Sequence, residues 1–180
     1  MVSNSSAECD KQLLSRVFWV GLGCKKNTPK SLIEEAMRSV FSAHLLPESA
    51  IAGIATLDIK RNEAGLIEFC VDHSLPLFFY SAEVLRSVAV PHPSSTIDRA
   101  VGTPSVAEAA ALLACWEEVE RRADQANAET QRRGDSFPTD LSTSYARHPT
   151  PILHIPKCHY RIAEQSGTVT IAVAQVWQAL

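Results

Sequence analysis

The strongest constraint on the fold is the segment 16–44, in which an apolar run leads into a glycine-containing turn and then a helical pattern. Residues 16–22 (RVFWVGL) are rich in β-branched and aromatic side chains, which favours a buried strand. Thr28 can cap a helix, and Pro29 suits its first position. Apolar residues then recur at helical spacing as far as Val40, which predicts a helix from Pro29 to about His44.

The same alternation continues over the first two thirds of the chain. Residues 50–57 (AIAGIATL) are typical of a second buried strand, and the polar turn 58–63 separates them from a helix over 64–73. A short strand over 77–80 and a short helix capped by Ser81 follow, whereas the proline-containing stretch 91–95 cannot be regular structure. Strands that alternate with helices predict an α/β fold with a largely parallel sheet and helices on both faces.

The last third of the chain departs from this alternation. Ser105 and Glu108 form a capping-box pattern before an alanine-rich helix that continues to about Arg122. Residues 121–150 are polar and are predicted to be a surface insertion, flexible in its later half. Strands at 152–155 and 168–176 read as a hairpin, so we expect a mixed, mostly parallel sheet. The predicted organisation is a flexible leader over 1–14 and a single domain over 15–180.

The composition excludes several function classes. The 180 residues are 46% hydrophobic, with a formal net charge of -3, so one well-packed domain is expected and non-specific nucleic-acid binding is not. No apolar run is long enough to span a membrane, and the N-terminus lacks a signal peptide's apolar core. The five cysteines are scattered and odd in number, which argues against a disulfide framework and favours the cytoplasm. The six histidines lack metal-ligand spacing, so we expect no metal and no organic cofactor.

The turn after the first strand is typical of an anion-binding site. Backbone N–H groups at the start of a helix are unpaired and the helix dipole is positive there. We therefore expect an anion to be held by the glycines, charges and hydroxyl of this turn, namely Gly21, Gly23, Cys24, Lys25, Lys26 and Thr28. A nucleotide is disfavoured, because Lys26 stands where the third glycine of a dinucleotide fingerprint belongs and no Walker pattern occurs.

Polar groups also follow other predicted strands, and in an open α/β sheet such corners share one edge. Asp58, Lys60 and Glu63 form either an acid–base set or a structural group, with Lys60 paired to a carboxylate and Glu63 supporting the next helix. The remaining candidates for ligand binding are Ser94, Gly102, Thr103, Ser105 and Lys157. A ligand with several acidic groups spread over a wide body suits such an edge better than a single phosphate does.

Three further residues have competing interpretations. Cys24 is either a nucleophile activated by Lys25 and the helix dipole or a small buried filler, and the second is the commoner case. His92, in a proline-locked loop, is the best lone acid–base candidate. Glu108 is expected to be structural, because a capping box explains it fully.

Four blocks of the sequence, in order, resemble the CobE family and the C-terminal domain of CbiG proteins of cobalamin biosynthesis. They are VGLGCKKNT, IATLDIKRNEAGLIEFCVDHSLPLFFYSAEVL, PSSTIDRAVGTPSVAEAAALLA and IPK with TVTIAVA. The resemblance runs from about Val17 to Val176 and implies a three-layer α/β/α domain with a mixed sheet. Asn27 stands where the family usually has glycine, and asparagine tolerates a left-handed backbone better than most residues.

The resemblance also implies a ligand. The pathway's intermediates are tetrapyrrole macrocycles rimmed with acetate and propionate groups, so the expected partner is a tetrapyrrole precorrin whose carboxylates meet helix N-termini and lysines. Full CbiG opens a lactone on a cobalt-precorrin, which suggests that this chain assists such a hydrolysis or another precorrin step. The alternative is a non-catalytic carrier, or a partner module for other corrin-biosynthesis enzymes.

Overall fold

The computed structural model describes residues 16–133, 150–161 and 167–176. Ten main elements follow one another in this part of the chain: β1 (Phe18–Cys24), α2 (Lys30–Ala43), β2 (Ile51–Leu57), α3 (Ala64–Asp72), β3 (Leu77–Tyr80), α4 (Ala82–Arg86), α5 (Ser95–Val101), α6 (Val106–Arg133), β4 (Pro151–Tyr160) and β5 (Val169–Val176). Short 3-10 turns precede and follow β2. The predicted alternation of strands and helices is confirmed from β1 to α4.

The five strands form one sheet in the order β3-β2-β1-β5-β4. β1, β2 and β3 pair in parallel, whereas β5 pairs antiparallel with both β1 and β4. Four strands therefore run in one direction and β5 runs against them. This arrangement confirms the mixed, mostly parallel sheet, and it brings the carboxyl ends of β1, β2 and β4 to the same edge.

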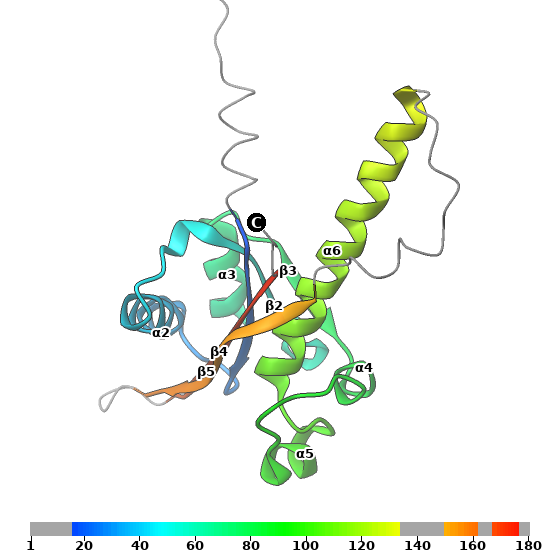
Figure 1. Cartoon of the computed structure of the whole chain (residues 1–180). Coiled ribbons are helices and arrows are strands. Elements are labelled where there is room, and N and C mark those ends of the chain that lie inside the picture. Colours follow the sequence, from blue (N-terminus) through cyan, green and yellow to red (C-terminus); the bar gives the residue numbers. More distant parts are fainter. Residues whose placement is uncertain (1–15, 134–149, 162–166, 177–180) are drawn as a thin grey trace, which may run out of the picture.

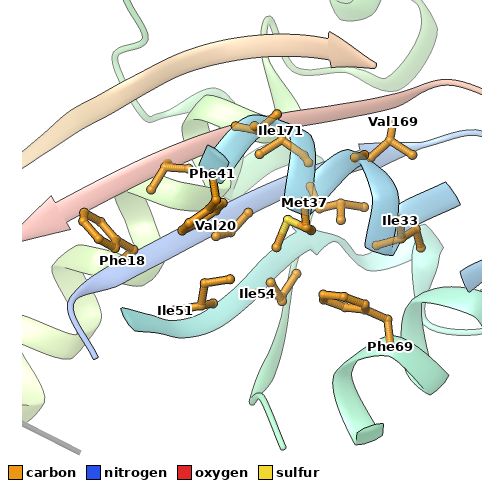
Figure 2. Close-up of a cluster of buried hydrophobic side chains, with 14 of the residues drawn as sticks. Phe18, Val20, Ile33, Met37, Phe41, Ile51, Ile54, Phe69, Val169 and Ile171 are labelled. Carbon is orange, nitrogen blue, oxygen red and sulfur yellow. The ribbon is translucent and has the colours of Figure 1, made fainter. Parts of the chain in front are cut away.

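Helices α2 and α3 cover one face of the sheet. Alternate residues of β1 point toward them, so that Phe18 and Val20 pack with Met37 and Phe41 of α2 in a buried cluster (Figure 2). Apolar side chains of β2, β5 and α3 complete this cluster. The large aliphatic and aromatic side chains of the protein are concentrated on this face, which makes it the main hydrophobic core.

The opposite face packs against α6 and is built from small side chains. Ala55 and Ala174 of the sheet contact a row of buried alanines on α6, beginning at Ala109. A Cβ atom at Gly21 would overlap the carbonyl oxygen of Ala107, so the helix backbone lies directly on β1. With α2 and α3 on one side and α6 on the other, the three layers are visible in Figure 1.

Several local predictions differ from the structure. Thr28 does not cap α2; Pro29 is the N-cap residue, and the Thr28 hydroxyl donates to the carbonyl of Lys25 at 2.8 Å. Helix α5 was not predicted, and α6 continues to Arg133, into the segment predicted as an insertion. The C-terminal half of α6 projects away from the sheet (Figure 1). The predicted leader, 1–14, and residues 134–149 lie outside the described residues.

Candidate functional site

A cleft of about 670 Å³ lies at the edge of the sheet where β1, β2 and β4 end and β5 begins. The loop after β1, the turn after β2, helix α5 and the start of α6 form its other walls. Seven of the residues expected to bind ligand line it: Gly23, Cys24, Lys25, Lys60, Ser94, Ser105 and Lys157. The cleft thus occupies the edge at which open α/β sheets hold their ligands.

The other candidate residues lie outside the lining of this cleft. They are Gly21, Lys26, Thr28, Asp58, Glu63, Gly102 and Thr103. Gly21 is needed for close packing on α6, whereas a Cβ atom at Gly23 would meet only ordinary contact with Thr170 at 3.7 Å. Gly102 ends α5 with a left-handed backbone, at φ 79°. The two glycines of the turn after β1 therefore have different structural surroundings.

One wall of the cleft is cationic. Lys25, Lys60, Lys157 and Arg161 line it, and no aspartate or glutamate does so in the described part of the chain. The facing wall is aliphatic, with Ile59 of the turn after β2 and Ile97 of α5 partly exposed to solvent at 66% and 38%. A cleft with cations on one side and exposed aliphatic surface on the other suits an apolar ligand that carries anionic groups at its edge.

The loop that carries Lys25 is held from behind by Glu63. Asn27 has a left-handed backbone, with φ 59°, and its N–H donates to Glu63 Oε2 at 2.7 Å. Lys60 Nζ lies 3.2 Å from Glu63 Oε1, and the Glu63 side chain is almost fully buried. Glu63 therefore links the turn after β2 to the loop after β1, while Lys60 lines the cleft.

Cys24 lies in the cleft but is not activated as a nucleophile. Burial raises the pKa of its thiol, and the neighbouring charge of Lys60 opposes this shift only in part. A thiol with a raised pKa stays protonated near neutral pH and reacts slowly. This environment fits the interpretation of Cys24 as a small packed side chain.

The capping box expected at the start of α6 does not form. The hydroxyl of Ser105 is buried without a hydrogen-bond partner among the described residues, and so is that of Thr103. The Glu108 carboxylate, fully buried, accepts instead from His92 Nδ1 at 2.9 Å, from the His92 backbone N–H at 3.3 Å and from the Lys157 backbone N–H at 3.2 Å. Tertiary contacts have therefore replaced the local cap.

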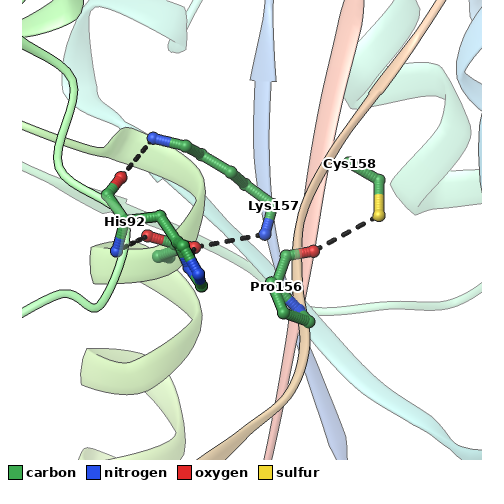
Figure 3. Close-up of polar contacts among 5 residues, drawn as sticks. His92, Pro156, Lys157 and Cys158 are labelled. Carbon is green, nitrogen blue, oxygen red and sulfur yellow. Dashed lines mark hydrogen bonds and ion pairs between the residues drawn. The ribbon is translucent and has the colours of Figure 1, made fainter.

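Glu108 connects two segments that flank the cleft. Figure 3 shows the side chain of Lys157 reaching the carbonyl oxygen of His92, so the proline-containing loop and β4 are joined by a second contact. The loop continues into Pro93 and Ser94, which line the cleft. Because the Glu108 carboxylate can only accept, His92 Nδ1 is the donor in their contact.

The sequence analysis missed several residues of the cleft. Beyond the aliphatic wall these are His159 and Arg161 of the β4 end, Thr56 of β2, and Thr168 and Thr170 at the start of β5. The alternation of polar residues in KCHYR, 157–161, is a signal that could have identified His159 and Arg161. The aliphatic wall has no comparable signal, because Ile97 lies on a helix that the sequence did not predict.

Metal and membrane features were also examined in the described part of the chain. Residues 16–133, 150–161 and 167–176 contain no group of three or more His, Cys, Asp or Glu side chains arranged to hold a metal ion. Over the same ranges, no helix combines the length and the apolar character that a membrane crossing needs.

Known proteins resemble this chain in sequence. It is 26% identical over 98 residues to a cobalt-precorrin-5A hydrolase of Priestia megaterium, and 31% identical over 94 residues to one of Salmonella typhimurium. These matches cover 54% and 52% of this chain but only 26% and 27% of the hydrolases. A protein CobE of Sinorhizobium sp is 30% identical over 102 residues, which is 55% of this chain and 66% of that protein.

Solved structures and a family model agree with these matches. The crystal structure of CobE, a protein from the cobalamin (vitamin B12) biosynthetic pathway, has a TM-score of 0.61 at 21% identity, over 90% of this chain and 95% of that one. The cobalamin biosynthesis protein chiG from Agrobacterium tumefaciens has a TM-score of 0.52 at 25% identity, over 90% and 100%. The family model of the cobalamin synthesis G C-terminus matches residues 18–174. The chain therefore belongs to that family, and it is a cobalamin biosynthesis protein related to CbiG and CobE.

Proposed function

We propose that the cleft binds a tetrapyrrole precorrin intermediate of corrin-ring synthesis. Family membership supports the pathway, and the cleft supports the class of ligand. A precorrin has a largely apolar macrocycle with acetate and propionate groups around its rim. The observation that carries the proposal is the division of the cleft into a cationic wall and an aliphatic wall, with no carboxylate among its described lining residues.

Binding is favoured over hydrolysis by this chain alone. Of the three residues considered as an acid–base set, Asp58 and Glu63 do not line the cleft, and Glu63 is engaged with Asn27 and Lys60. The chain spans about a quarter of the length of the hydrolases it matches, so their activity is not carried over to it. We infer a binding or carrier role, in which other corrin-pathway enzymes receive the bound intermediate.

The test is a titration of the protein with a precorrin-type tetrapyrrole, followed by the pigment's absorbance. Two adjacent lysines provide a matched pair, because Lys25 lines the cleft and Lys26 does not. We expect Lys25→Gln to weaken binding roughly tenfold, as for the loss of a hydrogen bond to a charged group. Lys26→Gln, with the same change in charge, should bind as the wild type does.

Each other result of the titration would contradict part of this proposal. Equal losses in both variants would mean that the cleft does not select between the two lysines. No binding by the wild type would refute the tetrapyrrole site. A slow spectral change after binding would show chemistry on the ligand and would favour the hydrolytic alternative. A stable complex with a pathway enzyme on gel filtration in the absence of pigment would favour the partner-module alternative.

A further inference from the structure

The end of β4 is re-aimed by an irregularity in its pairing with β5. Ile155 lies opposite Val173, and Cys158 lies opposite Ile171, so β4 has one more residue than β5 between these two pairs. Such a bulge changes which face of the sheet the following side chains point toward. Ile155 and Cys158, three residues apart, accordingly both contact the core under α2.

The bulge sets the alternation over the last residues of the strand. Cys158 and Tyr160 pack toward the core, and the Tyr160 hydroxyl reaches Glu35 of α2 at 3.0 Å. The residues between and beyond them, Lys157, His159 and Arg161, all line the cleft on the other side. A regular alternation from Ile155 would have directed Lys157 and His159 toward the apolar core instead.

We propose that Lys157, His159 and Arg161, here called the β4 row, bind successive carboxylates along one edge of the ligand; this rests on the function proposed above. Residues two apart on a strand are separated by about 7 Å, so the row presents three nitrogen-bearing side chains at a regular interval. The aliphatic surface of Ile97 and Ile59 lies on the opposite wall. The ligand class is a polycarboxylate with an apolar body, held with its acidic edge against β4.

Each member of the row contributes a different chemistry. Arg161 can bind a carboxylate through two parallel N–H groups, whereas Lys157 acts as a point charge whose backbone is fixed by Glu108. His159 Nδ1 lies 2.9 Å from the Thr170 hydroxyl, also in the lining of the cleft, which orients the ring and leaves Nε2 for the ligand. When Thr170 donates to Nδ1, Nε2 carries the hydrogen and donates to a carboxylate.

The experiment compares two corrinoids that share a ring and differ in rim charge: dicyanocobyrinic acid, with carboxylates, and dicyanocobinamide, with amides. Binding of each would be followed by absorbance for the wild type and for Lys157→Gln, His159→Gln and Arg161→Gln. We expect each substitution to weaken binding of the acid about fivefold to tenfold and to change binding of the amide less than about twofold. The triple variant should lose about a hundredfold or more for the acid.

Two variants serve as controls. Arg38→Gln removes one positive charge from the exposed face of α2, on the other side of the sheet, and Tyr160→Phe alters β4 on the face turned away from the cleft. Both should bind the acid as the wild type does, and circular dichroism would verify that every variant is folded.

The failures of the two proposals are distinguishable. If the wild type binds the acid and the single variants bind it equally well, the row is wrong while the tetrapyrrole site stands. If the variants lose acid and amide alike, the row does not read charge and the proposal is overturned. If the wild type binds neither corrinoid, both proposals fall.

Discussion

Ser105 and Glu108 stand at the start of α6, yet only the Glu108 side chain has hydrogen-bond partners among the described residues. We expect Ser105→Ala to leave the free energy of unfolding unchanged within about 0.5 kcal/mol, because no bond is lost. Glu108→Gln should cost about 1–3 kcal/mol, since an amide N–H₂ would face N–H donors of His92 or Lys157. Urea denaturation of both variants measures the difference. A cost of about 1 kcal/mol for Ser105→Ala, with none for Glu108→Gln, would restore the capping box.

Gly21 and Gly23 form a second pair of residues whose similarity in sequence hides different surroundings. A Cβ atom at Gly21 would overlap the Ala107 carbonyl oxygen, whereas one at Gly23 has room against Thr170. We predict that Gly21→Ala destabilises the fold by about 3 kcal/mol, at the upper end of overpacking effects, and that Gly23→Ala stays within about 0.5 kcal/mol. Denaturant midpoints of the two variants test this. Equal stability would mean that α6 does not lie directly on β1.

At the scale of the element, the sequence predicts what local periodicity determines. The strands and helices from β1 to α4 follow from runs and spacings within single segments, and the structure has them within a few residues of their predicted bounds. Helix α5 was missed because it is short and follows the proline-containing stretch 91–95, which ended the regular pattern. The direction of the β4 side chains could not be predicted, because the bulge exists only in the pairing with β5.

The candidate site shows the same limit. Residues at strand ends and loop starts, such as Gly23, Lys25 and Lys60, were predicted because the carboxyl edge of a sheet follows from topology. Capping by Thr28 and the capping box at Ser105 were wrong, since side chains distant in sequence, or a neighbouring carbonyl, offered competing partners. Local motifs specify which groups can bond, and tertiary packing decides which of them do.

At the scale of the whole molecule, the cleft joins segments that are far apart in the chain. Its walls come from the loop after β1, the turn after β2, α5, the start of α6 and the β4–β5 end of the sheet. A ligand that touches all of them binds the folded protein and not the unfolded chain. Ligand binding should therefore stabilise the entire fold.

The magnitude of this stabilisation can be predicted. At a free ligand concentration of 100 times Kd, binding adds about 2.7 kcal/mol to the free energy of unfolding. For a protein of this size, each kcal/mol shifts Tm by roughly 2–4 °C, so a tetrapyrrole should raise Tm by about 5–10 °C. Arg38→Gln should show the full shift and Arg161→Gln a smaller one at the same ligand concentration. An unchanged Tm at saturating pigment would mean that the pigment binds folded and unfolded chains alike, which excludes a site built from these distant segments.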